Sequence, residues 1–398
     1  MLNQCSSKSD RIRVLILAEQ ANPSWVSVPF VGWCHATALG KLAHIHLVTH
    51  ARNKEAILKS DFPKDQVTFI DLGFFDRLLK WLYTNMTRIP GGGQVTYTAF
   101  KIPFYYLFEF YAWRLFRKQL KSGVFDIVHR ITPVSPAMPS LFVKRCHAVR
   151  VPFIIGPLNG GLPWPKGFAH ILKKEREWLS YLRKLHTLLP YAKSTRKCAS
   201  AIILGSRATW NEMPKKFLSK CFYYSENGIT DDLLSLSTLS KPEFKTSPLR
   251  IAFAGRLVPL KGVDLIVRAA SQLILEKKIH LDIIGDGSER RYLEELVQTG
   301  HLSDGVTFHG WLLRDQVFSI LSKSHVFAFP SIREFGGGAV IEAMALGLVP
   351  IVVDYGGPAE IVTPETGFIL PLTTTLVSLF HLPNCLKNLM LELKHNSH

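Results

Sequence analysis

The feature that most constrains the fold is a series of short apolar runs, each followed by a longer segment with helical periodicity. The runs are apolar at successive positions, which indicates strands buried on both faces. Such strands, separated by helices, form a parallel sheet covered by helices. The sequence therefore predicts an α/β protein with two Rossmann-like halves in tandem. The expected strands span residues 13–18, 44–49, 67–72, 127–129, 153–155 and 201–204, then 249–254, 280–284, 306–308, 326–330 and 349–353.

The chain has 398 residues, which is too long for one hydrophobic core and predicts two domains. A stretch rich in Ser, Thr, Pro and Lys, residues 236–248, is typical of an interdomain linker. We therefore expect an N-terminal domain over residues 1–235 and a C-terminal domain over residues 249–375. A short tail over residues 376–398 follows, with one weak helix at about 385–393.

The chain is strongly basic, with 48 Lys and Arg against 31 Asp and Glu and a formal net charge of +17. This excess predicts an acidic partner, which can be nucleic acid, an anionic membrane surface or a phosphorylated substrate. The six cysteines form no C-x-x-C pair, which argues against zinc fingers and disulfide frameworks and favours reduced thiols in the cytoplasm. The polar N-terminus gives no sign of a signal peptide. The sequence contains no run of about 18 uncharged apolar residues, so no membrane-spanning helix is predicted.

Residues 74–121 interrupt the strand–helix pattern with many aromatic side chains and interleaved basic ones. An aromatic face flanked by Lys and Arg is typical of an amphipathic helix on an anionic membrane surface. The alternative is a long excursion of the first domain whose rings pack inside it. Both interpretations stay open at this point, and internal packing is favoured because aromatic residues are usually part of a core.

The most informative motif spans residues 330–360, in which Glu334 and Glu342 are separated by seven residues that include three successive glycines. The glycines lie between a predicted strand and a predicted helix, where backbone N–H groups can approach a ligand at a positive helix terminus. Both carboxylates can accept hydrogen bonds from hydroxyl groups. The combination predicts a polyhydroxylated ligand that carries phosphate, namely a nucleotide sugar.

A second loop, residues 255–262, follows the first strand of the second domain and carries Arg256 and Lys261. Two cations on one tight loop can neutralise a diphosphate, although the spacing is not that of a P-loop. Gly285 ends the next strand in a further glycine turn. Taken one at a time, each loop is equally well explained as an ordinary turn between a strand and a helix.

Together these motifs resemble glycosyltransferase family 4, whose GT-B fold consists of two facing Rossmann-like domains with a central cleft. The resemblance covers residues 227–371 through the E-x7-E signature, the G-R-x4-K loop and the sequence at 356–360. It is looser in the first domain, where it rests on residues 31–32 and 126–129. The resemblance implies a donor site in the second domain, an acceptor on the side of the first, transfer with retention of the anomeric configuration, and no metal.

The resemblance also implies a role for each site residue. Arg256 and Lys261 hold the diphosphate and stabilise the charge that develops on it. Glu342 accepts from the ribose hydroxyls, while Glu334 and the amides of residues 335–338 fix the donor hexose. The chain has no D-x-D triplet, which fits a metal-free site. The expected catalytic residues are Arg256, Lys261, Glu334 and His129. The expected donor-binding residues are Gly255, Gly285, Phe335, Gly336, Gly337, Gly338, Glu342 and Gly32.

Two features depart from the family pattern. Many relatives carry H-x-H after the fourth strand of the first domain, whereas this chain has His129, Arg130 and Ile131. His129 is then either a site residue or a core residue, and Arg130 or Thr132 could face the cleft instead. The segment after Pro371, residues 372–398, is shorter than the C-terminal helices that GT-B enzymes usually have. We therefore expect a truncated or altered end that affects domain closure.

We expect the protein to be a retaining, metal-independent glycosyltransferase that moves a hexose from a nucleotide-diphosphate sugar to a hydroxyl acceptor. A UDP-sugar is the donor that we expect before other nucleotide sugars. We expect a lipid-linked, polysaccharide or small acceptor near the loop 156–161, with a role in cell-envelope polysaccharide biosynthesis. No cofactor or nucleic acid partner is expected, and the location is cytoplasmic, with peripheral attachment at the inner face of the cell membrane. Two alternatives stay open, a sugar-nucleotide epimerase of GT-B fold and a nucleotide-sugar-binding homologue with weakened catalysis. An oxidoreductase is disfavoured because no G-x-G-x-x-G follows a predicted strand.

Overall fold

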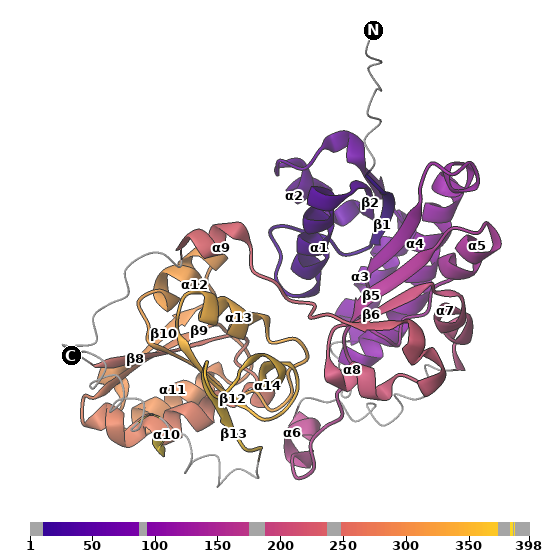
Figure 1. The fold of residues 1–398 in the computed structure, drawn as a ribbon. Coiled ribbons are helices and arrows are strands. Elements are labelled where there is room, and N and C mark those ends of the chain that lie inside the picture. Colours follow the sequence, from indigo (N-terminus) through magenta and orange to yellow (C-terminus); the bar gives the residue numbers. More distant parts are fainter. Residues whose placement is uncertain are drawn as a thin grey trace. The chain divides into compact units, whose positions relative to one another are not determined.

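The computed structural model describes residues 11–86, 94–174, 188–236, 248–372, 383–384 and 386. The chain divides into two compact units (Figure 1). The N-terminal unit contains Met1–Gly161 and Arg176–Glu226, and the C-terminal unit contains Leu162–Glu175 and Asn227–His398. Each unit is built around one parallel sheet, so the predicted α/β class is confirmed.

The N-terminal sheet has seven parallel strands in the order β3-β2-β1-β4-β5-β6-β7. The chain leaves β1 toward one edge and resumes at β4 on its other side, so a topological switch point lies between β1 and β4. The strands are β1 (Arg13–Ala18), β2 (His44–His50), β3 (Val67–Ile70), β4 (Ile127–Thr132), β5 (Phe153–Leu158), β6 (Ala201–Leu204) and β7 (Cys221–Tyr223).

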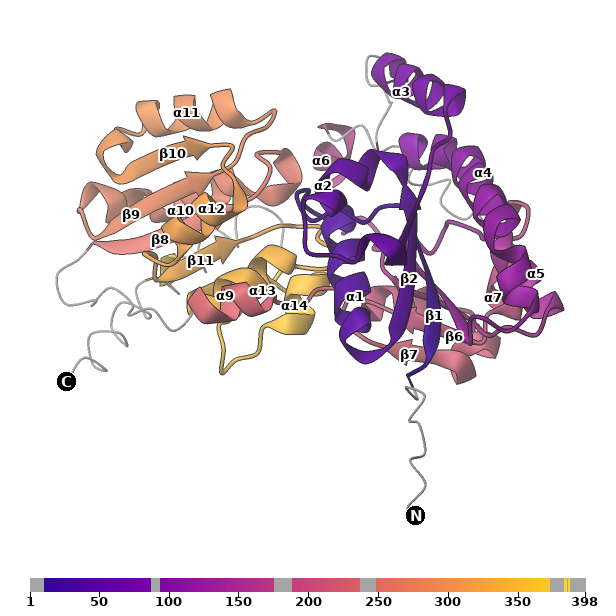
Figure 2. The same ribbon diagram turned by 90° about the horizontal axis from the view of Figure 1, so that it is seen from above.

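Helices cover both faces of this sheet (Figure 2). α1 packs on one face, where Ala36 shares a core with Ile16. α4 and α5 pack on the other, where Phe108 and Phe142 share a core with Leu15. Neighbouring residues of β1 thus serve two different cores, as expected for a strand covered on both faces. The helices are α1 (Val28–Leu42), α2 (Lys54–Leu58), α3 (Phe74–Met86), α4 (Gln94–Lys121), α5 (Phe142–Ala148), α7 (Ala192–Cys198) and α8 (Arg207–Glu212).

The aromatic and basic segment at 74–121 forms α3 and α4, and these two helices differ in burial. α4 buries Tyr105 and Phe108 in the core of the N-terminal unit. α3 instead leaves Phe74 and Trp81 63% and 62% exposed. Internal packing therefore accounts for these two rings of α4, whereas Phe110 of α4 is 43% exposed and the exposed rings of α3 have no such explanation.

The C-terminal sheet has six parallel strands in the order β10-β9-β8-β11-β12-β13. One hydrophobic core runs through the unit and joins the strands to the helices around them. The strands are β8 (Leu249–Ala254), β9 (Ile279–Ile284), β10 (Val306–Gly310), β11 (Val326–Phe329), β12 (Val349–Val353) and β13 (Phe368–Leu370). The helices are α6 (Ala169–Lys174), α9 (Asp231–Leu236), α10 (Val263–Leu275), α11 (Arg290–Thr299), α12 (Arg314–Leu321), α13 (Gly338–Ala345) and α14 (Gly357–Ile361).

The division between the units differs from the predicted boundary at residue 235. Residues 162–174 and α9 belong to the C-terminal unit, because Phe168 and Leu233 pack into its apolar clusters. Most of the predicted linker and of the predicted helix at 385–393 lies outside the described residues. Within the described part of the chain, no helix has the length and apolar character needed to cross a membrane.

Candidate functional site

The candidate site lies at the carboxyl edge of the C-terminal sheet. β8 is flanked by β9 and β11, so the loops after β8 and β11 lie at a topological switch point. Open α/β sheets bind ligands at such points. The loop after β8 carries Arg256 and Lys261, and the loop after β11 carries Glu334. The fold therefore places three of the four expected catalytic residues on the two loops at this point.

Lys261 and Glu334 form an ion pair. Lys261 ends the 3₁₀ turn Pro259–Lys261, and its ammonium nitrogen lies 4.6 Å from the centroid of the Phe329 ring. The two charged side chains are only 11% and 24% exposed, so solvent screens their attraction less than that of a surface pair. A diphosphate that approaches Lys261 has to compete with Glu334 for the ammonium group.

Gly255 and Gly285 allow two strand ends to approach each other closely. A Cβ atom on Gly285 would lie 1.9 Å from the carbonyl oxygen of Gly255, and Gly285 has a φ of 133° that L side chains rarely adopt. The close approach explains Gly285, whereas a Cβ atom on Gly255 would lie 3.2 Å from the ring of Phe253. A direct ligand contact of either glycine stays a prediction. Arg256, which follows Gly255, has an exposed side chain.

The glycine-rich loop after β11 is fixed by the loop after β12. The N–H of Gly357 donates to the carbonyl oxygen of Glu334 at 3.0 Å, and a Cβ atom on Gly356 would lie 2.2 Å from that oxygen. Gly337 has a φ of 69° and directly precedes α13, whose first N–H groups form the positive end of the helix. This loop and the start of α13 contain the predicted residues Glu334, Phe335, Gly336, Gly337 and Gly338.

Glu342 lies on α13 and pairs with Arg314 at the start of α12. Arg314 Nη2 donates to Glu342 Oε1 at 2.9 Å, and the Arg314 guanidinium lies 4.8 Å from the centroid of the Phe318 ring. Burial raises the pKa of Glu342, and the charge of Arg314 opposes that shift. Sequence reasoning missed Arg314, because an arginine at the start of an amphipathic helix carries no distinguishing motif.

Residues 162–174 form a further part of the site that sequence reasoning missed. Arg333 is buried, and its Nε donates to the carbonyl oxygen of Leu162 at 3.2 Å. Its guanidinium lies 4.9 Å from the ring centroid of Trp164 and 5.0 Å from that of Phe335. A cation close to two aromatic rings and bound to a backbone oxygen has little freedom to move. The segment therefore helps to fix the glycine-rich loop.

The same segment also contacts the loop after β8. Phe168 packs with Leu260 and Ile332, and α6 lies against the turn that ends at Lys261. The hydroxyl of Tyr355 donates to the carbonyl oxygen of Pro163 at 2.7 Å. Residues 162–174 thus touch the loops after β8, β11 and β12, which together form the candidate site.

Two predicted site residues lie in the N-terminal unit, and packing explains both. His129 is buried on β4 with its Nε2 atom 2.8 Å from the carbonyl oxygen of Gly156. Desolvation lowers the pKa of His129 to about 4, so the ring is neutral at pH 7 and the core role is favoured. Gly32 lies inside α1, where a Cβ atom would come within 2.1 Å of the carbonyl oxygen of Gln20. Arg130, the next residue on β4, is also buried, and its Nη1 donates to the carbonyl oxygen of Met138 at 2.9 Å.

The charged side chains of the site suit a ligand with both anionic and hydroxyl groups. Arg256, Lys261 and Arg314 are cationic and can neutralise phosphate, whereas Glu334 and Glu342 can accept hydrogen bonds from hydroxyls. Among the residues that the structure describes, no three His, Cys, Asp or Glu side chains are grouped so that they could hold a metal ion.

Comparisons with known sequences find similarity over about a third of the chain. The family described as Glycosyl transferases group 1 matches residues 238–374. An uncharacterized glycosyltransferase of Methanocaldococcus jannaschii is 33% identical over 119 residues, which are 30% of this chain and 30% of that protein. The D-inositol 3-phosphate glycosyltransferase of Mycobacteroides abscessus is 32% identical over 131 residues, 31% of this chain and 29% of that protein. The matched segments thus span about a third of each relative.

Comparisons with solved structures extend over nearly the whole chain. A glycosyltransferase from Rickettsia africae has a TM-score of 0.60 at 14% identity, covering 96% of this chain and 89% of its own. Anabaena HepE in complex with UDP has a TM-score of 0.57 at 14% identity, and the match covers 95% of this chain and 91% of the HepE chain. At this identity the likeness concerns the fold alone. Residues 238–374 thus match the family described as Glycosyl transferases group 1, in a chain that has the GT-B fold.

Proposed function

We propose that the protein is a retaining glycosyltransferase that transfers a hexose from a nucleotide-diphosphate sugar to a hydroxyl acceptor, without a metal ion or another cofactor. The observation that carries the proposal is the pair of Lys261 and Glu334 at the switch point, beside the glycine-rich loop. A cation there can stabilise the negative charge that develops on the diphosphate as the bond to the sugar breaks. UDP-sugars are the first donors to test, because HepE, which shares the fold, is described as a complex with UDP.

Each charged residue of the site has a role in this proposal. Lys261 exchanges Glu334 for the diphosphate, and the exposed Arg256 binds the same group from the solvent side. Glu334, once released, accepts hydrogen bonds from hexose hydroxyls beside the amides that follow it. Glu342, held by Arg314, accepts from the ribose hydroxyls. The leaving diphosphate takes up the proton of the acceptor hydroxyl, so no carboxylate has to act as nucleophile or base.

We further propose a cytoplasmic location with attachment to the inner face of the cell membrane, where the acceptor is lipid-linked or a growing polysaccharide. The support comes from α3, on which Phe74, Phe75 and Trp81 are 63%, 41% and 62% exposed. Arg77 on the same helix is also exposed. Exposed rings beside basic residues suit a surface of anionic headgroups over acyl chains. A small hydroxyl compound is the alternative acceptor.

The proposal is tested by calorimetric titration of the purified protein with UDP-, GDP- and ADP-sugars, followed by incubation of the bound donor with acceptor candidates. We expect one nucleotide sugar to bind and its sugar to appear on an acceptor with the same anomeric configuration, which proton NMR of the product determines. An epimerised nucleotide sugar without any acceptor product would instead indicate the epimerase. Donor binding without any turnover would indicate a binding homologue.

Metal independence is tested with the same reaction. Turnover should be unchanged in excess EDTA, since Arg256 and Lys261 supply the positive charge that a metal otherwise gives. Activity that disappears in EDTA and returns with Mg²⁺ or Mn²⁺ would contradict this part of the proposal while leaving the donor site intact.

A further inference from the structure

One face of the N-terminal sheet is covered by a continuous layer of helices (Figures 1 and 2). The layer consists of α4, α5, α7 and the 3₁₀ turn Lys215–Lys220, and apolar side chains from these elements share one core. α5 packs against both α4 and α7. The hydroxyl of Tyr106 donates to the carbonyl oxygen of Pro190 at 2.5 Å, and Lys220 Nζ donates to the carbonyl oxygen of Ala199 at 2.7 Å. These contacts join the four elements, so their outer sides form one surface.

The outer side of α4 is strongly basic. The exposed Arg114 is followed by the exposed Arg117, Lys118 and Lys121, at the three-, four- and seven-residue spacings that place side chains on one side of a helix. Phe110, one turn before Arg114, is 43% exposed and lies on the same side of the helix. α4 thus presents an aromatic ring and a row of cations to the outside of the unit.

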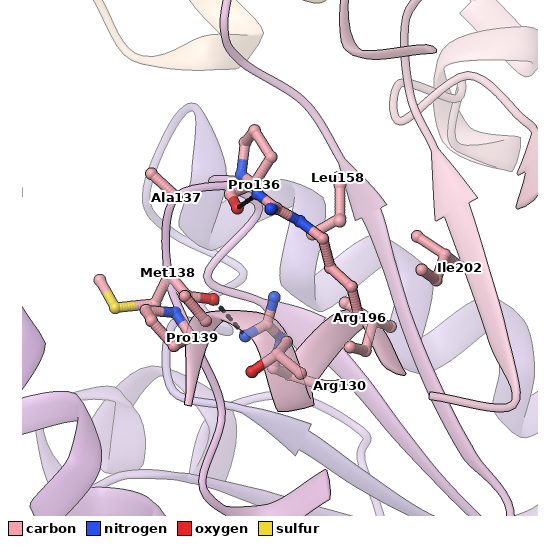
Figure 3. Close-up of a pocket in the computed structure, with 11 residues that line it drawn as sticks. Arg130, Pro136, Ala137, Met138, Pro139, Leu158, Arg196 and Ile202 are labelled. Atoms are coloured by element: carbon pink, nitrogen blue, oxygen red, sulfur yellow. Dashed lines mark hydrogen bonds between the residues drawn. The ribbon is translucent and has the colours of Figure 1, made fainter. Parts of the chain in front are cut away.

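The neighbouring elements of the layer continue this positive charge. Their exposed basic residues are Lys144, Lys193, Lys197, Lys215 and Lys216. The guanidinium of Arg145 on α5 lies 5.7 Å from the centroid of the Phe110 ring, so a cation of α5 adjoins the outer side of α4. Arg196 of α7 does not contribute, because it extends toward the loop 136–139, where its Nη2 lies 3.5 Å from the carbonyl oxygen of Pro136 (Figure 3). The exposed Lys and Arg residues of the four elements are named the basic face.

Acidic residues do not balance the basic face. The four elements contain one acidic residue, Glu109, which is fully buried and accepts a hydrogen bond from the Ser140 hydroxyl at 2.6 Å. Within the described part of the chain, no residue of the basic face forms an ion pair. On α11, by contrast, Arg290 and Arg291 each pair with a glutamate one turn later. Like charges that lie together without acids repel one another, and an extended anionic partner relieves that repulsion.

We propose that the basic face binds the surface of a bilayer that contains anionic lipids. α3 packs against α4, so the exposed rings of Phe74 and Trp81 belong to a helix that adjoins the layer. A bilayer offers anionic headgroups to the cations and an apolar interior to such rings, whereas the outer surface of a nucleic acid is charged throughout. The inference deepens the proposed membrane attachment and rests on it for the choice of partner. It adds a second contact, which acts through charge and needs no insertion of the α3 rings.

The experiment measures co-sedimentation of the full chain with phosphatidylcholine vesicles, with and without phosphatidylglycerol and without any nucleotide sugar. The parent should bind the vesicles that contain phosphatidylglycerol, and its affinity should fall as sodium chloride screens the charges. The triple variant Arg114→Gln, Arg117→Gln, Lys121→Gln should bind at least about tenfold more weakly, since each basic residue near an anionic surface contributes about fivefold. A second variant, Lys193→Gln with Lys197→Gln on α7, should also bind more weakly and tests the face apart from α4.

The matched control removes three exposed charges outside the layer, by Lys41→Gln, Lys54→Gln and Lys64→Gln on or beside α1 and α2. This control should bind nearly like the parent, and the melting temperatures of all variants should stay close to that of the parent because every substituted residue is exposed. Equal weakening in the control and in the variants of the basic face would show that only the net charge matters and would overturn the inference. Parental binding by both variants of the basic face, or no binding by the parent, would also overturn it.

Two further arms separate this inference from its alternatives. The double variant Phe74→Ser, Trp81→Ser should keep a salt-sensitive part of the vesicle binding, and loss of all binding in that variant would assign the attachment to α3 and refute the basic face. Tighter binding of a duplex oligonucleotide than of anionic vesicles at the same salt concentration, lost in the triple variant, would assign the face to nucleic acid and overturn the lipid partner. Vesicle binding is measured without donor or acceptor, so a failure of the proposed transferase activity is recognised separately.

Discussion

Arg314 Nη2 donates to Glu342 Oε1 at 2.9 Å, although the two residues lie on different helices, α12 and α13. Burial raises the pKa of Glu342, so its carboxyl group holds a proton more tightly in the folded than in the unfolded protein. The folded protein therefore loses stability as the pH rises through the range in which Glu342 ionises. Arg314 offsets part of that loss, because its charge and hydrogen bond favour the ionised carboxylate.

Glu342→Gln should bind the nucleotide sugar less tightly and yet be at least as stable as the parent at pH 8. The amide keeps the shape of the side chain but removes the buried charge. Thermal unfolding at pH 8 and pH 4 checks the second part, and any stability gain of the variant should shrink at pH 4, where the parental carboxyl is largely protonated. A variant that melts below the parent by the same margin at both pH values would contradict the assignment.

Lys261→Ala should weaken donor binding by about tenfold to a hundredfold, because a charge-assisted hydrogen bond to the diphosphate contributes about 1.5–3 kcal/mol. The exposed Lys323 provides a control, and Lys323→Ala should bind donor like the parent. Combining Lys261→Ala with Glu334→Ala in a double-mutant cycle tests the ion pair itself. Strictly additive losses of unfolding free energy would show that the two side chains do not stabilise each other.

Arg333→Ala should loosen the glycine-rich loop without unfolding the C-terminal unit. The substitution removes a cation that contacts the rings of Trp164 and Phe335, an interaction worth up to about 2 kcal/mol when shielded from water. Hydrogen exchange of the amides at 334–338 should become faster, and donor affinity should fall. The exposed Arg268 serves as the control position. Unchanged exchange at 334–338 would argue against a positioning role for Arg333.

His129→Gln should retain transferase activity if His129 is a core residue. Its pKa is about 4 in the folded protein against about 6.5 in an unfolded chain. Between these values the unfolded state binds more protons, so acidification from pH 7 to pH 4 should destabilise the parent by about 3 kcal/mol through this residue. Urea unfolding across that range should show a shallower pH dependence in the variant. Loss of turnover with normal folding would restore the catalytic interpretation.

Replacing Phe74 and Trp81 by Ser should reduce binding to vesicles that contain phosphatidylglycerol while leaving the melting temperature nearly unchanged, because both rings are exposed. Phe108→Ser is the contrasting variant. Phe108 is fully buried in α4, and the loss of a buried aromatic ring costs about 3–5 kcal/mol. Co-sedimentation at low and high salt separates ring insertion from charge attraction, since only the latter is screened. Wild-type vesicle binding by the folded double variant would exclude α3 as the membrane contact.

The parallel strands were predictable because each is a short apolar run between helical segments. β1 and β8 occupy the predicted residues without any shift. β7 and β13 were missed because both are three-residue edge strands, and Phe222 and Tyr223 of β7 are 59% and 47% exposed. A three-residue strand with one buried position has neither the length nor the apolar run that identified the others.

The candidate site was predictable where it depends on glycines and charges that lie close in sequence. Its supporting contacts were not, because they join residues far apart in the chain. Arg314 meets Glu342 only through the packing of α12 and α13, and Trp164 meets Arg333 only because residues 162–174 fold onto the C-terminal unit. A local pattern predicts a turn and its chemistry, whereas tertiary packing decides which distant side chain holds that turn in place.

The assignment of residues 162–174 to the C-terminal unit has a practical consequence for protein engineering. Among the described residues, the chain passes from one unit to the other at 161–162, between 174 and 188, and at 226–227. A fragment that begins at residue 227 therefore lacks the peptide that lies beside Arg333 and the turn of Lys261. Domain exchange with a protein of the same fold has to transfer this peptide together with its own C-terminal unit, since a single crossover at residue 227 would combine the candidate site with a foreign supporting peptide.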